Sequence, residues 1–388
     1  MKIKGVGARS ILDSRREKTI HVSIKTNVGE FSASSPTGKS TGKHEAKSYK
    51  KNIENDIKTI KNFSDYFSEE SLDKFEDLRR IEDILDRHVG ANTFFALESA
   101  ILKAMAKEQK KEIWQLINPN ASKFPRLVGN CIGGGTHSKS ISGKKPDFQE
   151  FLLIPDTKTT KEAYEINKKY QDSSELTLKN SDEKFKSSRN DENAWETSLN
   201  EKQVLEILKD FKLPLGLDIA ASSFYKRKKY HYENPRLIRT EEEQLGYISN
   251  LIKNFDIFYI EDPFYEENYE SFAEISKEFP KKLIVGDDLI VTNSKRLEKA
   301  IKMKAITGVI VKPNQCGSLI EVKKVCEMAN KNKIKIIFSH RSGETQESIL
   351  ADLAFGFQAN FLKCGILGKE RDVKIKRLID IEKSIKNC

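Results

Sequence analysis

The sequence predicts an α/β protein: a barrel of parallel strands and helices, similar to a TIM barrel, preceded by a smaller α+β domain. Near the N-terminus, two short stretches of alternating apolar and polar residues are followed by segments with helical spacing. After about residue 212, short apolar runs alternate with amphipathic helical stretches, which is typical of a parallel sheet covered on both faces. A chain of 388 residues also fits two domains better than one core.

The N-terminal segment reads as antiparallel strands followed by helices. Ile20, Val22 and Ile24 alternate with polar residues, which predicts a strand over 18–25, a turn at 27–30 and a return strand over 31–35. Helical spacing covers residues around 51–62, 69–88 and 92–109. Pro125 ends this region. We therefore predict an N-terminal capping domain at 1–125 and a C-terminal catalytic barrel domain at 126–388.

The barrel is predicted from a series of apolar runs. The intervening stretches 241–255 and 317–331 place their apolar residues on one helical face. Residues 155–212 are rich in Lys, Ser and Asn, and we expect a helix and a long loop over the barrel mouth. The predicted strands are 213–220, 257–260, 283–286, 308–311, 334–338 and 360–362.

Composition and charge exclude several classes of protein. The 68 Lys and Arg residues exceed the 58 Asp and Glu residues by 10, but both signs are interspersed, which favours a solvated surface over a nucleic-acid platform. Five scattered cysteines argue against a disulfide framework or a zinc site and favour a reducing cytosol. No apolar run approaches the roughly 18 residues of a membrane span. We expect a cytoplasmic protein without nucleic-acid or membrane partners.

Reactive residues follow six consecutive predicted strands. Because the carboxyl ends of parallel strands meet at one face of a barrel, these side chains should converge where such barrels carry their chemistry. The six residues are Asp218, Glu261, Asp287, Lys312, His340 and Lys363.

The three carboxylates of this series predict a cation site. Asp218, Glu261 and Asp287 would repel one another at one mouth, and hard oxygen ligands without Cys or His favour Mg²⁺. The alternative is that each carboxylate pairs separately with a Lys or Arg.

The cations of the series predict acid–base chemistry. Lys312 beside Lys363 and a metal ion should lose affinity for its proton and could act as a base. Arg341 and Ser342 form a compact grip for a phosphate or carboxylate. Together these groups indicate proton abstraction next to a carboxylate, with the metal holding the enediolate charge.

Two glycine-containing segments need separate interpretation. Gly38-Lys39-Ser40 looks like the end of a nucleotide P-loop, but the required earlier glycine is Ala33, so we interpret it as a mobile lid. His137 follows Gly133-Gly134-Gly135, and a lone histidine in such a loop is more often structural than catalytic.

Several motifs resemble the enolase (phosphopyruvate hydratase) family over nearly the whole chain. The most specific are Ile260-Glu261-Asp262-Pro263-Phe264, Gly286-Asp287-Asp288-Leu289, and Lys312 to Gly317, which looks like the family's K-x-N-Q-x-G. Ser339 to Thr345 is similar to the family's S-H-R-S-G-E-T without change. The lid at 36–42 resembles the family's lid, and the implied fold is an α+β domain before a barrel whose first strands break the simple βα order.

The resemblance implies a role for each matched residue. The reaction would be the reversible dehydration of 2-phosphoglycerate to phosphoenolpyruvate in glycolysis and gluconeogenesis, a hydro-lyase activity with two Mg²⁺ ions per site. Lys312 would be the base, and Glu192 would protonate the departing hydroxyl with help from Glu150. Asp218, Glu261 and Asp287 would hold the first metal ion and Ser40 the second. His137, Glu150, His340 and Lys363 would contact the substrate, and Arg341 with Ser342 its phosphate.

The chain also departs from the family pattern. The family's G-D-E-G around the acid is replaced by Asn190-Asp191-Glu192-Asn193, and Lys39 stands where a small residue is common. Two alternatives to a working enolase stay open: a related lyase acting on another carboxylate, and a diverged paralogue with a binding or scaffold role. We expect a homo-oligomer, a dimer or larger.

Overall fold

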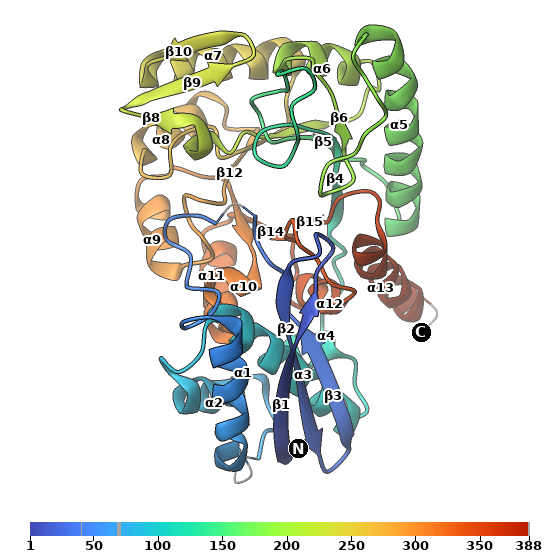
Figure 1. Cartoon of the computed structure of the whole chain (residues 1–388), viewed down its shortest axis with the longest axis vertical. Helices are drawn as coiled ribbons and strands as arrows, with labels where there is room; N and C mark the ends of the chain where they lie inside the picture. The colour runs from blue at the N-terminus through green and yellow to red at the C-terminus, as the bar shows by residue number, and fades with distance from the viewer. Residues whose placement is uncertain (40, 68–70, 387–388) are drawn as a thin grey trace.

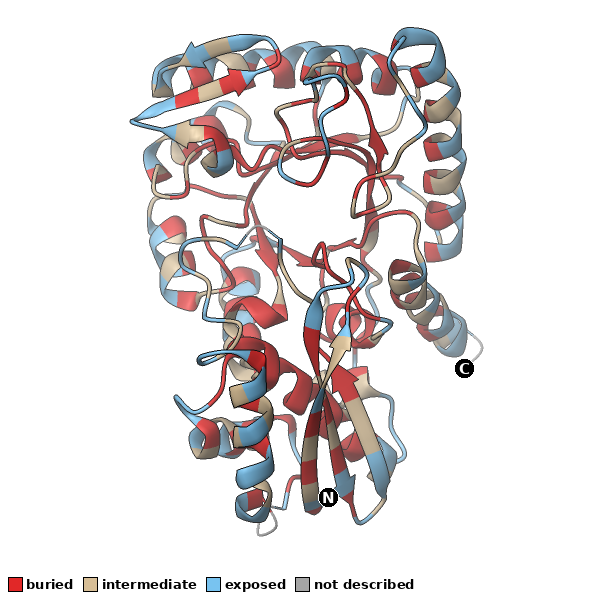
Figure 2. Ribbon diagram, viewed as in Figure 1, coloured by how far each residue is buried: buried red, intermediate tan, exposed pale blue. Residues whose placement is uncertain are grey.

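A small sheet domain and a closed barrel make up the computed structural model, which describes residues 1–39, 41–67 and 71–386 (Figure 1). The predicted fold class is confirmed. Buried residues concentrate on the barrel strands and on the inner faces of the surrounding helices, while outer helix faces are exposed (Figure 2).

The N-terminal domain is a three-stranded antiparallel sheet covered by helices. Strands β1 (Ile3–Leu12), β2 (Lys18–Thr26) and β3 (Gly29–Ser34) lie in this order, with Val22 opposite both Ala8 and Ala33. The apolar side chains of β2 pack against the long buried helix α3 (Ala91–Glu108). Helices α1 (Ile53–Asn62) and α4 (Ile113–Ile117) complete the domain.

Two expectations for this domain need correction. Strand β1 was not predicted, because Gly5 and Gly7 interrupt its apolar alternation. The helix expected at 69–88 is confined to α2 (Leu78–Leu85), after a 3₁₀ turn at Phe75–Asp77. The Asp77 carboxylate accepts hydrogen bonds from the backbone N–H groups of Asp73 and Lys74, which fixes a turn before the helix begins. Residues 69–70 of that prediction lie outside the described residues.

Eight strands close the barrel. Strands β4 and β5 are antiparallel to each other, β5 is also antiparallel to β7, and all later neighbours are parallel, with β15 pairing back onto β4. The antiparallel start explains why the strand–helix rhythm is clean only after residue 212. The barrel strands are β4 (Arg126–Gly133), β5 (Glu150–Leu153), β7 (Leu215–Asp218), β11 (Tyr259–Glu261), β12 (Leu283–Gly286), β13 (Gly308–Val311), β14 (Lys335–Ser339) and β15 (Phe361–Lys363).

Helices surround this barrel in Figure 1. The segment 155–212 contributes two of them and the two-residue strand β6 (Trp195–Glu196), which pairs with β4. A small hairpin sheet, β8 (Tyr225–Lys226), β9 (Lys229–Glu233) and β10 (Arg236–Arg239), was not predicted. The helices are α5 (Thr160–Ser181), α6 (Glu201–Lys209), α7 (Glu241–Phe255), α8 (Tyr269–Glu278), α9 (Ser294–Lys302), α11 (Leu319–Lys331), α12 (Ile349–Gly356) and α13 (Lys369–Lys386), with the short α10 (Pro313–Cys316) before α11.

The root of the lid is docked on the barrel. The backbones of Thr37 and Gly343 exchange hydrogen bonds of 2.7 and 2.9 Å. A Cβ atom on Gly343 would lie 2.1 Å from an Asp13 carboxylate oxygen, so a glycine is needed for this close approach. The two domains therefore meet at the edge of the barrel mouth. In the described part of the chain, no helix is both long and apolar enough to cross a membrane.

Candidate active site

Two of the predicted carboxylates share one buried lysine. Asp218 ends β7, Glu261 ends β11, and the two residues are paired across these strands. The Lys363 Nζ atom, at the end of β15, lies 2.8 Å from an Asp218 oxygen, 2.9 Å from both Glu261 oxygens and 3.2 Å from Glu150. Asp218 and Glu261 thus share one cation rather than each having its own, and a charge cluster occupies this part of the barrel mouth.

Asp287 lies one strand further on and has a different environment. It forms an ion pair with Lys312 and accepts a 3.0 Å hydrogen bond from Gln315 Nε2. Its nearest carboxylate neighbours are Asp262 and Asp288, with one oxygen of each residue within 4.8 Å of the others. The predicted metal ligands therefore converge on one mouth, in two adjoining groups.

Several residues that sequence reasoning did not assign hold this arrangement in place. Asp262 has a left-handed backbone (φ 41°), and its carboxylate accepts the backbone N–H groups of Asp287 at 3.0 Å and Asp288 at 2.7 Å. The Tyr259 hydroxyl donates to Glu261 at 2.5 Å. The second carboxylate directly after Glu261, in the E-D-P-F motif, was a signal for Asp262, whereas nothing in the spacing of the sequence pointed to Tyr259.

The electrostatics of the first group favour a bound cation. Burial and the neighbouring Asp218 raise the pKa of Glu261 to about 8, although Lys363 opposes them. The single lysine therefore does not fully offset burial and the repulsion between the carboxylates. The donors are carboxylate oxygens, the ligand type that Mg²⁺ prefers, so the residues fit the hard cation that the sequence predicted.

The pKa of Lys312 is raised, whereas the sequence led us to expect that this lysine would lose affinity for its proton. Burial lowers its pKa, but the attraction of Asp287 outweighs burial and the repulsion from Arg341 and Lys363, so the net pKa is raised. The same pairing outweighs burial at Asp287 and lowers its pKa. The expectation included a metal ion bound by Asp287, which would offset the negative charge of this carboxylate. In the protein alone, the charge of Asp287 stabilises the protonated form of Lys312.

A further group adjoins the first, because Glu150 is paired with Asp218 on the neighbouring strand. Oxygens of Glu150 and Glu192 and a ring nitrogen of His137 lie within 4.8 Å of one another. The His137 Nδ1 atom is 3.3 Å from Glu192, and His340 Nε2 is 3.7 Å from it. All four residues are buried. The predicted acid, its helper and the two histidines are thus brought together.

The two carboxyls of this group differ in how readily they hold a proton. Burial and the charge of Glu192 raise the pKa of Glu150 well above its usual range, despite the attraction of Lys363. Burial also acts on Glu192, but the two histidines outweigh it and hold the Glu192 pKa well below its usual range. A proton shared by the pair is therefore held by Glu150 rather than by Glu192.

Asparagines on both sides of Glu192 fix the backbone that carries it. Asn193 adopts a left-handed backbone (φ 63°), a conformation that asparagine tolerates better than most residues. The Asn190 side-chain oxygen accepts the backbone N–H groups of Glu192 at 2.9 Å and Ala194 at 3.0 Å. Asn130 Nδ2 donates to Glu192 at 3.1 Å.

The predicted anion grip is engaged by the lid segment. Both terminal nitrogens of Arg341 contact the Glu45 carboxylate, at 3.0 and 3.1 Å, and Asn314 accepts a 3.2 Å hydrogen bond. A Cβ atom on Gly38 would lie 1.9 Å from the guanidinium, so only glycine allows the lid this close. Ser342 Oγ accepts the backbone N–H of Lys39 at 2.9 Å. Ser40, the predicted second-metal ligand, lies outside the described residues.

These groups surround a small buried hollow at the barrel mouth. It is lined by residues from the lid, from the Glu150–Glu192 group and from the anion grip, together with the two lysines: Gly38, His137, Gln149, Glu150, Glu192, Lys312, Ser339, His340, Arg341, Ser342 and Lys363. Asp218 and Glu261 adjoin it through their contacts with Lys363. Carboxylates whose chemistry fits a cation, beside two lysines and a buried carboxyl pair at the mouth of a TIM-like barrel, define the site of an acid–base enzyme.

Comparison with known proteins identifies the family. The sequence matches the family models described as the enolase N-terminal domain, over residues 3–117, and the enolase C-terminal TIM barrel domain, over residues 122–388. It is 34% identical to the enolase of Methanosphaera stadtmanae, with 99% of this chain and 98% of that protein covered. It is 32% identical to the enolase of Pyrobaculum aerophilum, with 98% and 96% covered, and 33% identical to that of Archaeoglobus fulgidus, with 98% and 97% covered. The chain belongs to the enolase family.

The raised pKa of Glu261 predicts how Mg²⁺ affinity depends on pH. Glu261 must lose its proton to bind a cation, so affinity should increase as pH rises toward about 8, by up to about tenfold per pH unit below it. The stability of the metal-free protein should depend on pH in the opposite direction. Between about pH 4.5 and about pH 8, Glu261 is protonated in the folded chain but not in the unfolded chain. The free energy of unfolding should therefore fall as pH rises through this window.

Calorimetric titration with Mg²⁺ in buffers of different ionisation heat measures both the affinity and the protons released. Glu261→Gln serves as the matched variant, because it keeps the shape but carries no titrating proton. Its weaker binding should not vary with pH through Glu261. Equal affinity in the wild type at low and high pH, without proton release, would contradict the assignment.

Proposed function

We propose that this protein catalyses the Mg²⁺-dependent, reversible dehydration of 2-phosphoglycerate to phosphoenolpyruvate and water, the hydro-lyase step of glycolysis and gluconeogenesis. The observation that carries the proposal is the convergence of Lys312, Lys363, the Glu150–Glu192 pair and an arginine–serine pair in one hollow, with Asp218, Glu261 and Asp287 bound to these two lysines beside it. Membership of the enolase family supports the same reaction.

The proposed cation content is two Mg²⁺ ions per active site. Asp218, Glu261 and Asp287 would hold the first ion, and Ser40 would help to hold the second. Bound there, Mg²⁺ supplies positive charge that stabilises the enediolate form of the substrate carboxylate.

The proton transfers are assigned to this chain's side chains. Lys312 Nζ, once neutral, takes the proton from the substrate carbon beside the carboxylate, and the electrons of that C–H bond pass into the enediolate. In the second step these electrons form the C–C double bond as the C–O bond to the hydroxyl breaks. The Glu150–Glu192 pair gives its proton to the leaving hydroxyl, which departs as water. His137 contacts Glu192 and can orient it toward that oxygen.

The remaining polar groups would bind and orient the substrate. Lys363 and His340 line the hollow and face its anionic centre. Arg341 and Ser342 would take the phosphate, which must displace the Glu45 carboxylate from the guanidinium. This exchange couples substrate binding to a movement of the segment that carries the lid.

A direct assay distinguishes this reaction from its alternatives. The purified full chain should form phosphoenolpyruvate from 2-phosphoglycerate with Mg²⁺ and not after removal of divalent cations by a chelator. Turnover of only an unphosphorylated hydroxy acid would favour a related lyase. A folded, Mg²⁺-binding protein without turnover of either substrate would favour the binding or scaffold role.

Other features remain predictions of the sequence and belong to the same proposal. We place the division between the capping and barrel domains at about residue 125, before β4. A homo-oligomeric state and a cytoplasmic location are expected. The expected partner is the small phosphorylated carboxylate, with neither nucleic acid nor membrane involved.

The Lys39–Asp191 ion pair predicts a measurable contribution of the lid to substrate affinity. Lys39 Nζ lies 2.9 Å from Asp191, and the two side chains are 41% and 14% exposed. A pair this exposed contributes about 0.2–1 kcal/mol. Lys39→Ala should therefore raise KM by up to about fivefold and leave kcat nearly unchanged.

Steady-state kinetics at low and high salt check this prediction, because the effect should shrink when salt screens the pair. The matched control is Lys43→Ala, which removes an exposed lysine from the same segment. An equal rise in KM for both variants would mean that general positive charge, rather than the contact with Asp191, is responsible.

A further inference from the structure

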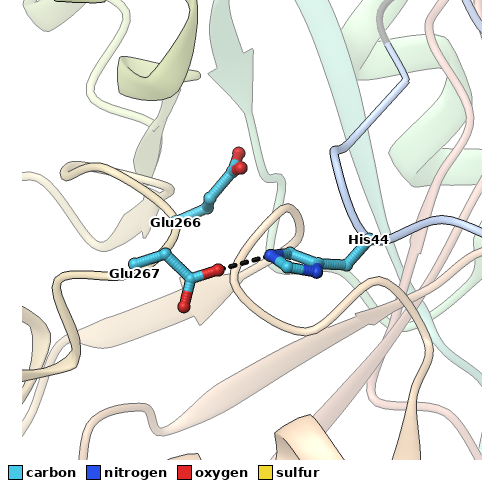
Figure 3. A group of neighbouring side chains, drawn as sticks. All are labelled: His44, Glu266 and Glu267. Atoms are coloured by element: carbon cyan, nitrogen blue, oxygen red, sulfur yellow. Dashed lines mark hydrogen bonds and ion pairs between the residues drawn. The ribbon is translucent and has the colours of Figure 1, made fainter.

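A second set of metal-ligating side chains lies outside the hollow. His44 follows the lid, whereas Glu266 and Glu267 lie in the loop between β11 and α8 (Figure 3). One ring nitrogen of His44 and one carboxylate oxygen from each glutamate lie within 4.8 Å of one another. Two segments more than 200 residues apart in sequence thus bring three ligands together.

Glu266 is a buried residue whose carboxylate has no donor from the protein. The residue is 6% exposed. Its backbone N–H donates to Ser222 Oγ at 3.0 Å, and its carbonyl accepts from Arg296 at 2.8 Å. Within residues 1–39, 41–67 and 71–386, however, its carboxylate has no hydrogen bond or ion pair. A carboxylate on a residue this far buried gains from a charged partner, and a bound cation would supply one.

The other two ligands are accessible and already attract each other. His44 Nε2 forms an ion pair with a Glu267 oxygen, shown as the dashed line in Figure 3, and these side chains are 32% and 35% exposed. Arg296 also contacts Glu267, at 3.2 Å. Arg296 is separately anchored by 2.8 Å hydrogen bonds to the carbonyls of Leu289 and Glu266, so it stays in place if Glu267 turns toward a metal ion.

We propose that His44, Glu266 and Glu267 form a binding site for a divalent transition-metal ion, with Zn²⁺ as the best match. One imidazole and two carboxylates supply three ligands of the kinds that Zn²⁺ accepts, and solvent completes a four-coordinate site. The imidazole separates this site from the all-oxygen site at the barrel mouth, which suits Mg²⁺. The three ligand atoms already lie within 4.8 Å of one another, and side-chain rotation would adjust them to the spacing of about 3.3 Å that bonds of about 2 Å require.

The position of the site gives it a physical consequence. His44 belongs to the segment that carries the lid and Glu45, whereas both glutamates belong to the barrel. A metal ion held by all three would tie the end of the lid segment to the barrel. Backbone amides around residues 42–46 should then exchange more slowly with solvent deuterium when Zn²⁺ is present.

The test is a Zn²⁺ titration of the metal-stripped full chain in excess Mg²⁺, without substrate, followed by calorimetry. Co²⁺ replaces Zn²⁺ in a parallel titration, because its visible spectrum reports a histidine ligand and a low coordination number. We expect one site in the wild type. Glu266→Gln and His44→Ala should each weaken Zn²⁺ binding by about tenfold or more. Circular dichroism and Mg²⁺ binding establish that each variant is folded.

Two controls make the outcome decisive. Glu270→Gln changes an exposed glutamate on neighbouring α8 and should leave Zn²⁺ affinity unchanged. Glu192→Gln disrupts the other histidine–carboxylate group, at the barrel mouth, and should also leave it unchanged. Loss of binding in Glu192→Gln with full binding in Glu266→Gln would place the ion at the mouth and overturn the proposal. Absence of binding in the wild type would do the same. Neither result depends on whether the proposed dehydration occurs.

Discussion

Replacing Lys312 with Met should reduce turnover of 2-phosphoglycerate by about 10²–10⁴-fold, the range that a positioned general base contributes. Lys312 follows β13 and lines the hollow. Its Nζ atom is the nitrogen base that we assign to the carbon-bound proton. Steady-state assays at saturating Mg²⁺ and substrate measure the loss as a fall in kcat.

A second variant separates base chemistry from charge. Lys312→Arg retains a cation beside Asp287, but a guanidinium does not give up its proton in proteins. It should be about as inactive as Lys312→Met while keeping more of the stability. If Lys312→Arg retained substantial activity, the lysine would act only by its charge, and the base would have to be sought elsewhere.

Replacing Lys363 with Met should produce the largest loss of stability. Its ammonium group balances Asp218, Glu261 and Glu150 at distances of 2.8–3.2 Å, and all four residues are buried. Removing one partner of a buried ion cluster leaves uncompensated charge and typically costs about 3–5 kcal/mol. Urea denaturation without Mg²⁺ at neutral pH should show this loss as a lower midpoint.

The cause of that loss can be checked by restoring the charge balance. Added Mg²⁺ should return part of the stability, and so should acidification through the raised pKa of Glu261. Lys282→Met is the matched control, because its pair with Asp256 lies at the surface, with the Asp256 side chain 94% exposed, and should contribute less than about 1 kcal/mol. Equal destabilisation by both substitutions would argue against a charge cluster at Lys363.

The sequence carried most of the information about the barrel. Apolar runs located β12 and β13 at their observed bounds, because buried parallel strands leave a continuous apolar signature. Their ends placed Asp287 and Lys312 at the mouth. Strand β1 was not predicted because glycines interrupt its alternation of apolar and polar residues. The β8–β10 sheet was not predicted because a small surface sheet has little apolar pattern.

The finer arrangement of the site could not be read from the sequence. Strand order indicates that Asp218, Glu261 and Asp287 share a mouth, but not that Lys363 bridges the first two while Lys312 pairs with the third. These pairings depend on side-chain reach across the barrel. Similarly, the contact of Glu45 with Arg341 joins the lid segment to the barrel over 296 residues of sequence.

Exchange of the substrate's carbon-bound proton with solvent deuterium tests the central assignment most directly. In D₂O with Mg²⁺, the wild type should exchange the proton beside the carboxylate of 2-phosphoglycerate, as followed by proton NMR. Glu192→Gln should retain exchange while losing dehydration, since the acid acts after the base. Lys312→Met should lose both. Exchange that persists in Lys312→Met at the wild-type rate would contradict the assignment of Lys312 as the base.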